Sequence, residues 1–393
     1  MSDIHNNLNQ YRAALSQRDG KIYLNTGITG PLSAAAKLAV SDWLFAQQEK
    51  NGYLAAKELA EKAQGLVARL IGAEPGEIAL KNSTTHGIYE AIFSLDWSEG
   101  DEAVISNREH HAVIRPLLRL RERYGIVIRF FETQPDAVAS LSAQLSSRTK
   151  LVAFSHVSYI TGERLPAKEL IAAAHERGVP VVIDGAQSAG AIPLDARDMD
   201  VDYYSLPGQK WLFGPQGTGA LYVAKRIVDA YKPITDDETL PEPYQDEKLS
   251  ADIQRYAPAP PSALAVSGFA ASLEWLLDTV GLDGLYGAIA DISAYAISEL
   301  SKLDGITVIT PEDSRAGLVS FRSDARPAKD LLERLKDSDI HARLVPPLDY
   351  VRLSLAFFIR KEDVDRLVEV VRGFVAGDDA AGPVVAASVT AGA

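Results

Sequence analysis

The sequence predicts an α/β fold, with a mostly parallel seven-stranded sheet between helices in a large domain and a smaller α+β domain at its C-terminal side. Two patterns lead to this class. Apolar runs of strand length recur between residues 77 and 223, and helical periods fall between most of them. Strands that alternate with helices favour a parallel sheet covered on both faces. The length of 393 residues, 47% of them hydrophobic, is enough for two domains with large cores.

The predicted elements of the large domain follow in order along the chain. An extended segment at 21–27 comes first, and amphipathic helices are expected at 33–49 and 54–72. The strands are expected at 77–81, 102–106, 126–131, 149–155, 180–184, 201–205 and 219–223. Helices are expected between them at 84–95, 112–124, 135–145 and 166–178. In sheets of this kind ligands bind at the carboxyl ends of the strands.

The C-terminal part of the chain predicts a second domain. Its expected helices lie at 261–279, 283–303, 327–336 and 361–375, and its strands at 306–309, 317–321, 341–345 and 350–355. The acidic, aperiodic stretch 232–250 is expected to be a loop, either over the site entrance or a subunit interface, or on the solvated surface. The expected organisation is an N-terminal segment over 1–20, a large domain over 21–250, a small domain with linking helices over 251–376 and a disordered tail over 377–393.

Composition argues against several classes of function. The net charge of −13 opposes a nucleic-acid or anionic-membrane surface, because phosphate groups bind clustered lysine and arginine. No apolar run reaches the ~20 residues that span a bilayer, so we expect no membrane partner. The first residues lack the basic and apolar regions of a signal peptide, so we expect a cytoplasmic protein. Cysteine is absent and the histidines are scattered, which excludes disulfides and predicts no metal site.

Two residues at strand ends form the most informative pair. Asp184 ends the apolar run Val-Pro-Val-Val-Ile-Asp, and Lys210 follows the next predicted strand and precedes the apolar residues 211–213. An amine in apolar surroundings loses solvation and becomes nucleophilic at neutral pH. An enzyme that uses pyridoxal phosphate (PLP) needs such an amine for a Schiff base with the cofactor, and a carboxylate for the protonated ring nitrogen. A solvated lysine and a turn aspartate are the alternatives when each is taken alone, but together they favour PLP chemistry.

Around Asp184 and Lys210 the chain resembles the class V PLP-dependent enzymes, which include cysteine desulfurases, cysteine/cystine C–S lyases and isopenicillin N epimerase. The resemblance extends over about residues 20–375 and is densest at 82–87, 109–116 and 152–223. It implies PLP fold type I, PLP as the cofactor and a small amino-acid substrate. It also implies a homodimer with its active site between the two domains and near the subunit interface.

The resemblance implies further cofactor contacts. The segment Asn-Ser-Thr-Thr-His-Gly at 82–87 matches the phosphate-binding turn, in which Thr84 and Thr85 open a helix whose N-terminal N–H groups attract anions. Ordinary helix caps are the alternative for such residues. His110, in the motif Glu-His-His, matches the histidine that stacks on the pyridine ring and shuttles protons. Gln187 matches the residue that hydrogen-bonds the phenolic oxygen of the ring.

Four residues are candidate substrate contacts. Arg352, in Asp-Tyr-Val-Arg-Leu-Ser-Leu, aligns with the family arginine that clamps the substrate α-carboxylate, a task that suits a planar guanidinium. Tyr159 stands where desulfurases carry an asparagine near the ring, and an aromatic residue there fits the lyase branch. Asn25 of the entry segment is a further candidate. Arg343 is another, in a position whose role the resemblance leaves open.

Three positions depart from the family pattern. Pro207 stands where a serine or threonine usually contacts the phosphate, and Pro260 where a hydroxyl reaches the phosphate of the neighbouring subunit. Gln209 replaces the usual histidine before Lys210 and can still donate an amide hydrogen. The missing hydrogen bonds are worth on the order of 1–3 kcal/mol each when charged. We therefore expect PLP to bind with reduced affinity; the alternative is a site that has changed to another ligand or a reduced activity.

The absence of cysteine distinguishes among the activities of these relatives. A cysteine desulfurase carries the sulfur away on a catalytic cysteine, and this chain has none. The leading hypothesis is therefore a C–S lyase: β-elimination from cysteine, cystine or a related sulfur amino acid gives pyruvate, ammonia and sulfide or persulfide. An epimerase or aminotransferase of the same class is the alternative, because the cofactor contacts are shared. A non-catalytic relative is a third hypothesis, which Pro207 and Pro260 favour and the intact Lys210 and Asp184 oppose.

Overall fold

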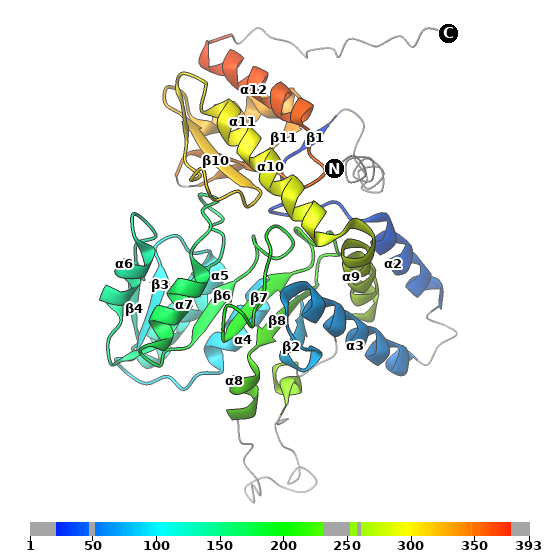
Figure 1. The fold of residues 1–393 in the computed structure, drawn as a ribbon, viewed down its shortest axis with the longest axis vertical. Helices are drawn as coiled ribbons and strands as arrows, with labels where there is room; N and C mark the ends of the chain where they lie inside the picture. The colour runs from blue at the N-terminus through cyan, green and yellow to red at the C-terminus, as the bar shows by residue number, and fades with distance from the viewer. Residues whose placement is uncertain (1–20, 47–51, 231–251, 258–260, 347, 379–393) are drawn as a thin grey trace, which may run out of the picture. The chain divides into compact units, whose positions relative to one another are not determined.

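The computed structural model describes residues 21–46, 52–230, 252–257, 261–346 and 348–378 (Figure 1). The chain forms two compact units. The first contains Gly27–Tyr159 and Arg164–Tyr286, and the second contains Ile160–Glu163, the stretch that ends at Thr26 and the chain from Gly287 onward. Several predictions concern parts of the chain outside the described residues, and they stay predictions. These are the domain boundary at residue 250, the segment 1–20, the loop 232–250 and most of the tail 377–393.

The first unit is built on the seven-stranded sheet. Its strands lie in the order β2 (Ile78–Lys81), β8 (Gly219–Val223), β7 (Tyr203–Pro207), β6 (Val181–Asp184), β5 (Thr149–Ser155), β3 (Glu102–Ser106) and β4 (Val127–Phe131). The pairs from β7 to β4 are parallel, and β8 is antiparallel to both of its neighbours. Except for the edge strand β4 and one lysine side chain in β5, the strand residues are buried. The predicted mostly parallel seven-stranded sheet is confirmed.

Helices cover this sheet. Ala103 and Ile105 of β3 share a core with helices α4 (Thr84–Phe93) and α5 (His111–Tyr124). Val104, which points to the other face, is equally buried, as expected for a sheet covered on both sides. Two more predicted helices follow, α6 (Ala137–Gln144) and α7 (Ala167–His175). Three short elements were not predicted: η1 (Pro75–Glu77), α8 (Lys225–Ala230) and η2 (Ile253–Tyr256).

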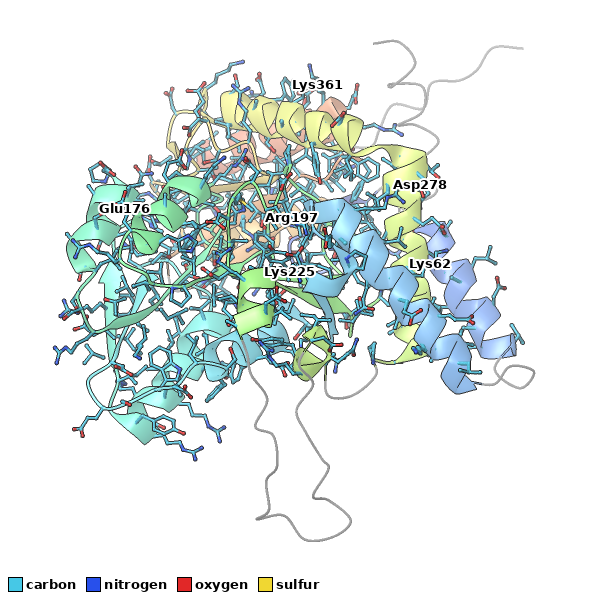
Figure 2. All side chains as sticks on the ribbon, turned by 60° about the horizontal axis from the view of Figure 1, so that its bottom comes forward. Lys62, Glu176, Arg197, Lys225, Asp278 and Lys361 are labelled. Carbon is cyan, nitrogen blue, oxygen red and sulfur yellow. The ribbon has the colours of Figure 1, made fainter. Side chains whose placement is uncertain are left out.

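A helical layer completes the first unit. Helix α9 (Ala263–Glu274) packs on α2 (Ala34–Ala46) and α3 (Gly52–Ile71), and continues as a π-helical turn, η3 (Trp275–Val280). Ion pairs Lys62–Glu274 (2.9 Å) and Arg69–Asp278 (2.7 Å) join α3 to this helix; Figure 2 labels Lys62 of α3 and Asp278 of η3. Such exposed pairs contribute about 0–1 kcal/mol each, so apolar packing dominates.

In the described part of the chain, one helical stretch, Ala263–Val280, is long and apolar enough to cross a membrane, with a mean hydropathy of 1.3. Of its residues, 44% are buried within the structure. The side chains of Phe269, Leu273 and Leu276 are fully buried. The apolar character is therefore accounted for by the packing of a core helix.

The second unit contains two small sheets. Strand β1 (Ile22–Tyr23) pairs in parallel with β11 (Ile340–His341). The other sheet is antiparallel, in the order β12 (Arg343–Val345), β13 (Tyr350–Ser354), β10 (Leu318–Ser323) and β9 (Ile306–Val308). Helix α10 (Leu282–Leu300) leads into this unit, which also holds α11 (Ala328–Asp337) and α12 (Lys361–Val375). The single strand predicted at 341–345 is wrong, because the chain changes partner at Ala342 and forms two strands in different sheets.

Candidate active site

Lys210 lies in a tight turn that follows β7, and it is half-buried. The turn is fixed by backbone hydrogen bonds. Gly208 N–H donates to the Thr218 carbonyl (2.9 Å), and Gly214 N–H donates to the Gly208 carbonyl (2.9 Å). Phe213 N–H donates to the carbonyl of Lys210 itself (3.2 Å), with Phe213 in the left-handed region at φ 53°. The backbone that carries the Lys210 amine is therefore rigidly held.

A second segment, which contains Gly30, closes over this turn. Gly30 N–H donates to the carbonyl of Gln209 over 2.7 Å. A Cβ atom at Gly30 would lie 2.2 Å from the Lys210 carbonyl oxygen and 2.9 Å from the Phe213 ring. The approach of the two segments thus requires glycine at this position.

We expect Gly30→Ala to displace the Lys210 turn, which would lower the free energy of unfolding by about 1–3 kcal/mol and weaken PLP binding. Gly65→Ala in α3 is the matched control, because no atom lies within 4 Å of the added Cβ. That change should stabilise the helix by about 0.5–1 kcal/mol. Thermal unfolding and PLP titration of both variants test this; equal behaviour would show that the two segments do not need their close approach.

Asp184 ends β6 and is buried. Its Oδ1 accepts a hydrogen bond from Ala186 N–H (2.8 Å), and its Oδ2 accepts none from the described residues. Burial raises the pKa of Asp184, and the positive charge of Lys210 acts in the opposite direction. A buried carboxylate with one oxygen open is suited to a cationic donor such as a protonated ring nitrogen.

Gln187 links the Asp184 loop to the Lys210 turn. Its Nε2 donates to the Gly27 carbonyl (2.9 Å), and its Oε1 accepts from the Trp211 indole (3.0 Å). A primary amide carries two N–H groups, so one hydrogen remains for a further acceptor. This geometry is compatible with the predicted contact to the phenolic oxygen, which stays a prediction.

His110 caps α5 and lies in an aromatic cluster. Its Nδ1 accepts from Ala112 N–H (3.2 Å), which in the neutral ring leaves the proton on Nε2. The His110 ring centroid is 3.7 Å from that of His111 and 5.0 Å from that of Tyr159, which it meets edge-on at 89°. Burial, followed by the charges of Arg115 and Lys210, lowers the pKa of His111. His110 and Tyr159 therefore lie together, in the same unit as Lys210.

The segment at the start of α4 offers an anion site. Ser83 caps the helix, since its Oγ accepts from His86 N–H (3.2 Å). The Thr84 side chain is buried, and its Oγ1 has no hydrogen-bond partner among the described residues. Thr85 is exposed. A buried, unsatisfied hydroxyl at a helix N-terminus suits a phosphate group.

These residues fit PLP. Thr84 would meet the phosphate, Asp184 the ring nitrogen and Lys210 the aldehyde. Gln209 adds a buried Oε1 that has no partner within the described part of the chain. Pro207 is buried at the end of β7 opposite Gly219, and Pro260 lies outside the described residues, so the effect of both on the phosphate stays a prediction. In the described ranges, no group of three His, Cys, Asp or Glu side chains could hold a metal ion.

The other candidates belong to the second unit. Arg352 is only 1% exposed and lies on β13, with Arg343 opposite it on β12. Asn25 forms a backbone bridge with Ser354, two positions further along β13 and on the same face as Arg352. The Asn25 Oδ1 and Ser354 Oγ atoms are buried without hydrogen-bond partners among the described residues. The Arg352 guanidinium and the Ser354 hydroxyl are donors that suit a carboxylate ligand, whereas Asn25 Oδ1 is an acceptor.

Glu109 is a buried residue next to His110 for which no role is predicted from the sequence. Its carboxylate accepts hydrogen bonds from the Ser106 hydroxyl and from both the N–H (2.9 Å) and the hydroxyl (2.8 Å) of Ser155. Burial raises its pKa to about 7, and the nearby charge of Asp184 adds to the increase. The one signal in the sequence was a carboxylate between a predicted apolar strand and His110.

Comparisons with known proteins agree with this geometry. The model of the family Aminotransferase class-V matches residues 47–367. A probable cysteine desulfurase 2 of Mycobacterium leprae is 31% identical over 80% of this chain and 80% of its own length. A cysteine desulfurase of Haloferax volcanii is 30% identical over 79% and 78%. A structure of the cystine C–S lyase C-DES with cysteine persulfide has a TM-score of 0.83 at 27% identity, covering 90% of this chain and 98% of C-DES. A mutant of C-DES with glycine covalently linked to the PLP cofactor gives 0.85 at 26%, over 92% and 98%.

Proposed function

Because this chain belongs to the aminotransferase class-V family and PLP is its cofactor, we propose that it is a C–S lyase acting on cysteine, cystine or a related sulfur amino acid. The observation that carries the proposal is the absence of cysteine from a chain that keeps Lys210, Asp184 and His110. Without a thiol no persulfide can form on the protein. The sulfur must then leave as free sulfide or as a small-molecule persulfide.

The side chains have distinct roles in this proposal. Bound PLP supplies the electron sink for the charge that remains when the Cα–H bond breaks. Lys210 holds the cofactor until the substrate amine replaces it, and its freed amine then takes the Cα proton. Asp184 would keep the ring nitrogen protonated, and His110 would be the histidine beside the cofactor. Loss of the β-sulfur and addition of water give pyruvate and ammonia, with hydrogen sulfide from cysteine or cysteine persulfide from cystine.

A product assay tests the proposal. The purified protein, loaded with PLP, is incubated with L-cysteine and with L-cystine, and pyruvate, ammonia and released sulfur are measured. We expect pyruvate and ammonia in equal amounts from at least one of them. Binding of either amino acid that changes the cofactor absorbance without pyruvate would contradict elimination and favour an epimerase or aminotransferase. No absorbance change with either would remove the substrate assignment.

We propose that Arg352 binds the substrate α-carboxylate. Arg352→Lys should raise KM for the sulfur amino acid by about tenfold with a smaller change in kcat, because an ammonium group cannot form the bidentate contact of a guanidinium. Arg322→Lys is the control, since Arg322 lies on the neighbouring strand β10 with its side chain 51% exposed. Steady-state kinetics of both variants check this. An unchanged KM in Arg352→Lys would exclude the carboxylate role.

The homodimer is part of the proposal. Large apolar side chains on α2 are exposed, among them Leu38 at 63% and Phe45 at 82%. Leu54 at the start of α3 is exposed as well. Exposed apolar side chains on one helical layer are typical of a protein interface. A monomeric mass in sedimentation equilibrium would contradict this part.

A further inference from the structure

Glu109 and Asp184 differ from the other buried carboxylates described in the first unit. The remaining three pair with arginine: Glu77 with Arg197, Glu102 with Arg129, and Asp202 with Arg226. Arg197 is labelled in Figure 2 beside Lys225, whose backbone also contacts Glu77. Glu109 instead faces neutral donors, from Ser106 and Ser155. A carboxyl group buried without a cation is stable mainly in its neutral form.

The contacts of Glu109 join two parts of the site. Glu109 directly precedes His110, and its side chain reaches β5 through both the N–H and the hydroxyl of Ser155. Ser155 is the register partner of Asp184 on the adjacent parallel strand β6. The next residue, His156, donates its N–H to the Asp184 carbonyl (3.1 Å). One side chain thus connects the loop of His110 to the strand ends that present Asp184.

Ser155 suits either charge state of Glu109. A hydroxyl can donate to a carboxylate or accept from a protonated acid, so the contact survives a change of protonation. The titratable groups on the surrounding elements are Arg108 and His110 in the same loop, His156 after β5, Asp184 on β6, and Lys210 after β7. Burial lowers the pKa of His156 to about 3, so this ring is neutral at neutral pH. Asp184 is the group whose charge acts on Glu109.

We propose that Glu109 is a positioning residue: as a neutral acid it clamps the loop of His110 to the end of β5 and leaves Asp184 as the negative charge at these strand ends. The clamp stands on contacts within the protein. Its effect on the cofactor rests on the proposed function. Ionisation of Glu109 would place a second negative charge beside Asp184.

The clamp is tested on the apoprotein. Glu109→Ala removes the contacts, Glu109→Gln mimics the neutral acid, and Glu102→Gln is the control, a buried carboxylate at the other end of β3. The NMR signals of the His110 ring are measured in protein with 15N-labelled histidine and are assigned by comparison with His110→Gln. Their chemical shifts should change in Glu109→Ala and stay the same in Glu109→Gln and Glu102→Gln. Unmoved signals in Glu109→Ala, or equal movement in Glu102→Gln, would overturn the positioning role.

The charge state is tested through stability against pH. Because the pKa of Glu109 is raised in the folded state, its carboxyl group stabilises the fold at low pH. This stabilisation is fully present below the ordinary pKa of a glutamate and is lost as the pH rises through about 7. The thermal midpoint of the wild-type apoprotein should therefore fall between pH 5 and pH 8 more than that of Glu109→Gln. Glu102→Gln should keep the wild-type slope, because the pKa of Glu102 is lowered and lies below this window. A wild-type slope in Glu109→Gln would show that Glu109 is already ionised.

PLP binding connects the clamp to the site. At pH 6, Glu109→Gln should bind PLP within about threefold of wild type, and Glu109→Ala about tenfold more weakly. Full affinity in Glu109→Ala would overturn the effect on the cofactor. If no variant and not even the wild type binds PLP, the proposed function fails, while the histidine signals and the pH slopes still decide the role of Glu109.

Discussion

Replacing Lys210 by alanine should abolish turnover of cysteine and cystine while the protein stays folded. The amine has two tasks in the proposed reaction, since it holds the cofactor and then moves the Cα proton. Loss of a positioned proton-transfer group alone costs about 10²–10⁴-fold in rate, and loss of the covalent attachment adds to this. We expect kcat to fall by at least about 10³-fold. The measurement is pyruvate formation, together with the absorbance of the bound cofactor.

Lys225→Ala is the matched control for Lys210→Ala. The Lys225 side chain is 65% exposed and pairs with Asp229 (3.1 Å), so its loss should leave both activity and cofactor absorbance unchanged. The Lys210 turn is held by backbone hydrogen bonds that do not involve its amine, and Lys210→Ala should therefore unfold at about the wild-type temperature in the apoprotein. Retained turnover in folded Lys210→Ala would exclude Lys210 as the attachment site.

The sheet of the first unit could be predicted from sequence because its strands are buried. Runs such as Val-Val-Ile at the start of β6 are uniformly apolar, and helical periods separate them, so strand type and approximate position follow from the pattern. The pairing of β1 with β11 could not be predicted in this way. Two-residue strands carry no periodicity, and their partners are more than 300 positions apart in the chain. The same limit merged β11 and β12 into one predicted strand.

The site was predictable where chemistry dictates a residue type. Asp184 and Lys210 stand at strand ends in apolar surroundings, which is unusual for charged side chains. Glu109 and Ser155 carry no such signal, because a glutamate in a loop and a serine at a strand end are common. Only the fold shows that Glu109 turns inward and that Ser155 stands beside Asp184. Residues that act through other residues are defined by tertiary contacts rather than by local sequence.

Replacing Asp184 by asparagine should stabilise the apoprotein and at the same time remove most of the activity. The pKa of Asp184 is raised by burial, so its contribution to stability is complete below its ordinary pKa and is lost as the pH rises. Asparagine does not ionise, so Asp184→Asn does not lose stability in this way as the pH rises. Its apoprotein should therefore unfold at a higher temperature than wild type near pH 7, and the difference should grow with pH. Thermal unfolding of both apoproteins from pH 5 to pH 8 measures this.

Adding the cofactor should act against this difference in unfolding temperature between the two proteins. A carboxylate stabilises a protonated ring nitrogen, whereas an amide does not, so the gain in unfolding temperature on adding PLP should be smaller in Asp184→Asn than in wild type. Loss of one preorganised electrostatic contact costs on the order of 10²–10³-fold in kcat, and we expect that decrease in pyruvate formation. Asp198→Asn is the control, because Asp198 is exposed and its pair with Lys168 is a surface contact. If the Asp184→Asn apoprotein were less stable than wild type, Asp184 would be a residue that stabilises the fold. The opposite result would mean that the protein keeps a destabilising charge because the ring nitrogen requires it.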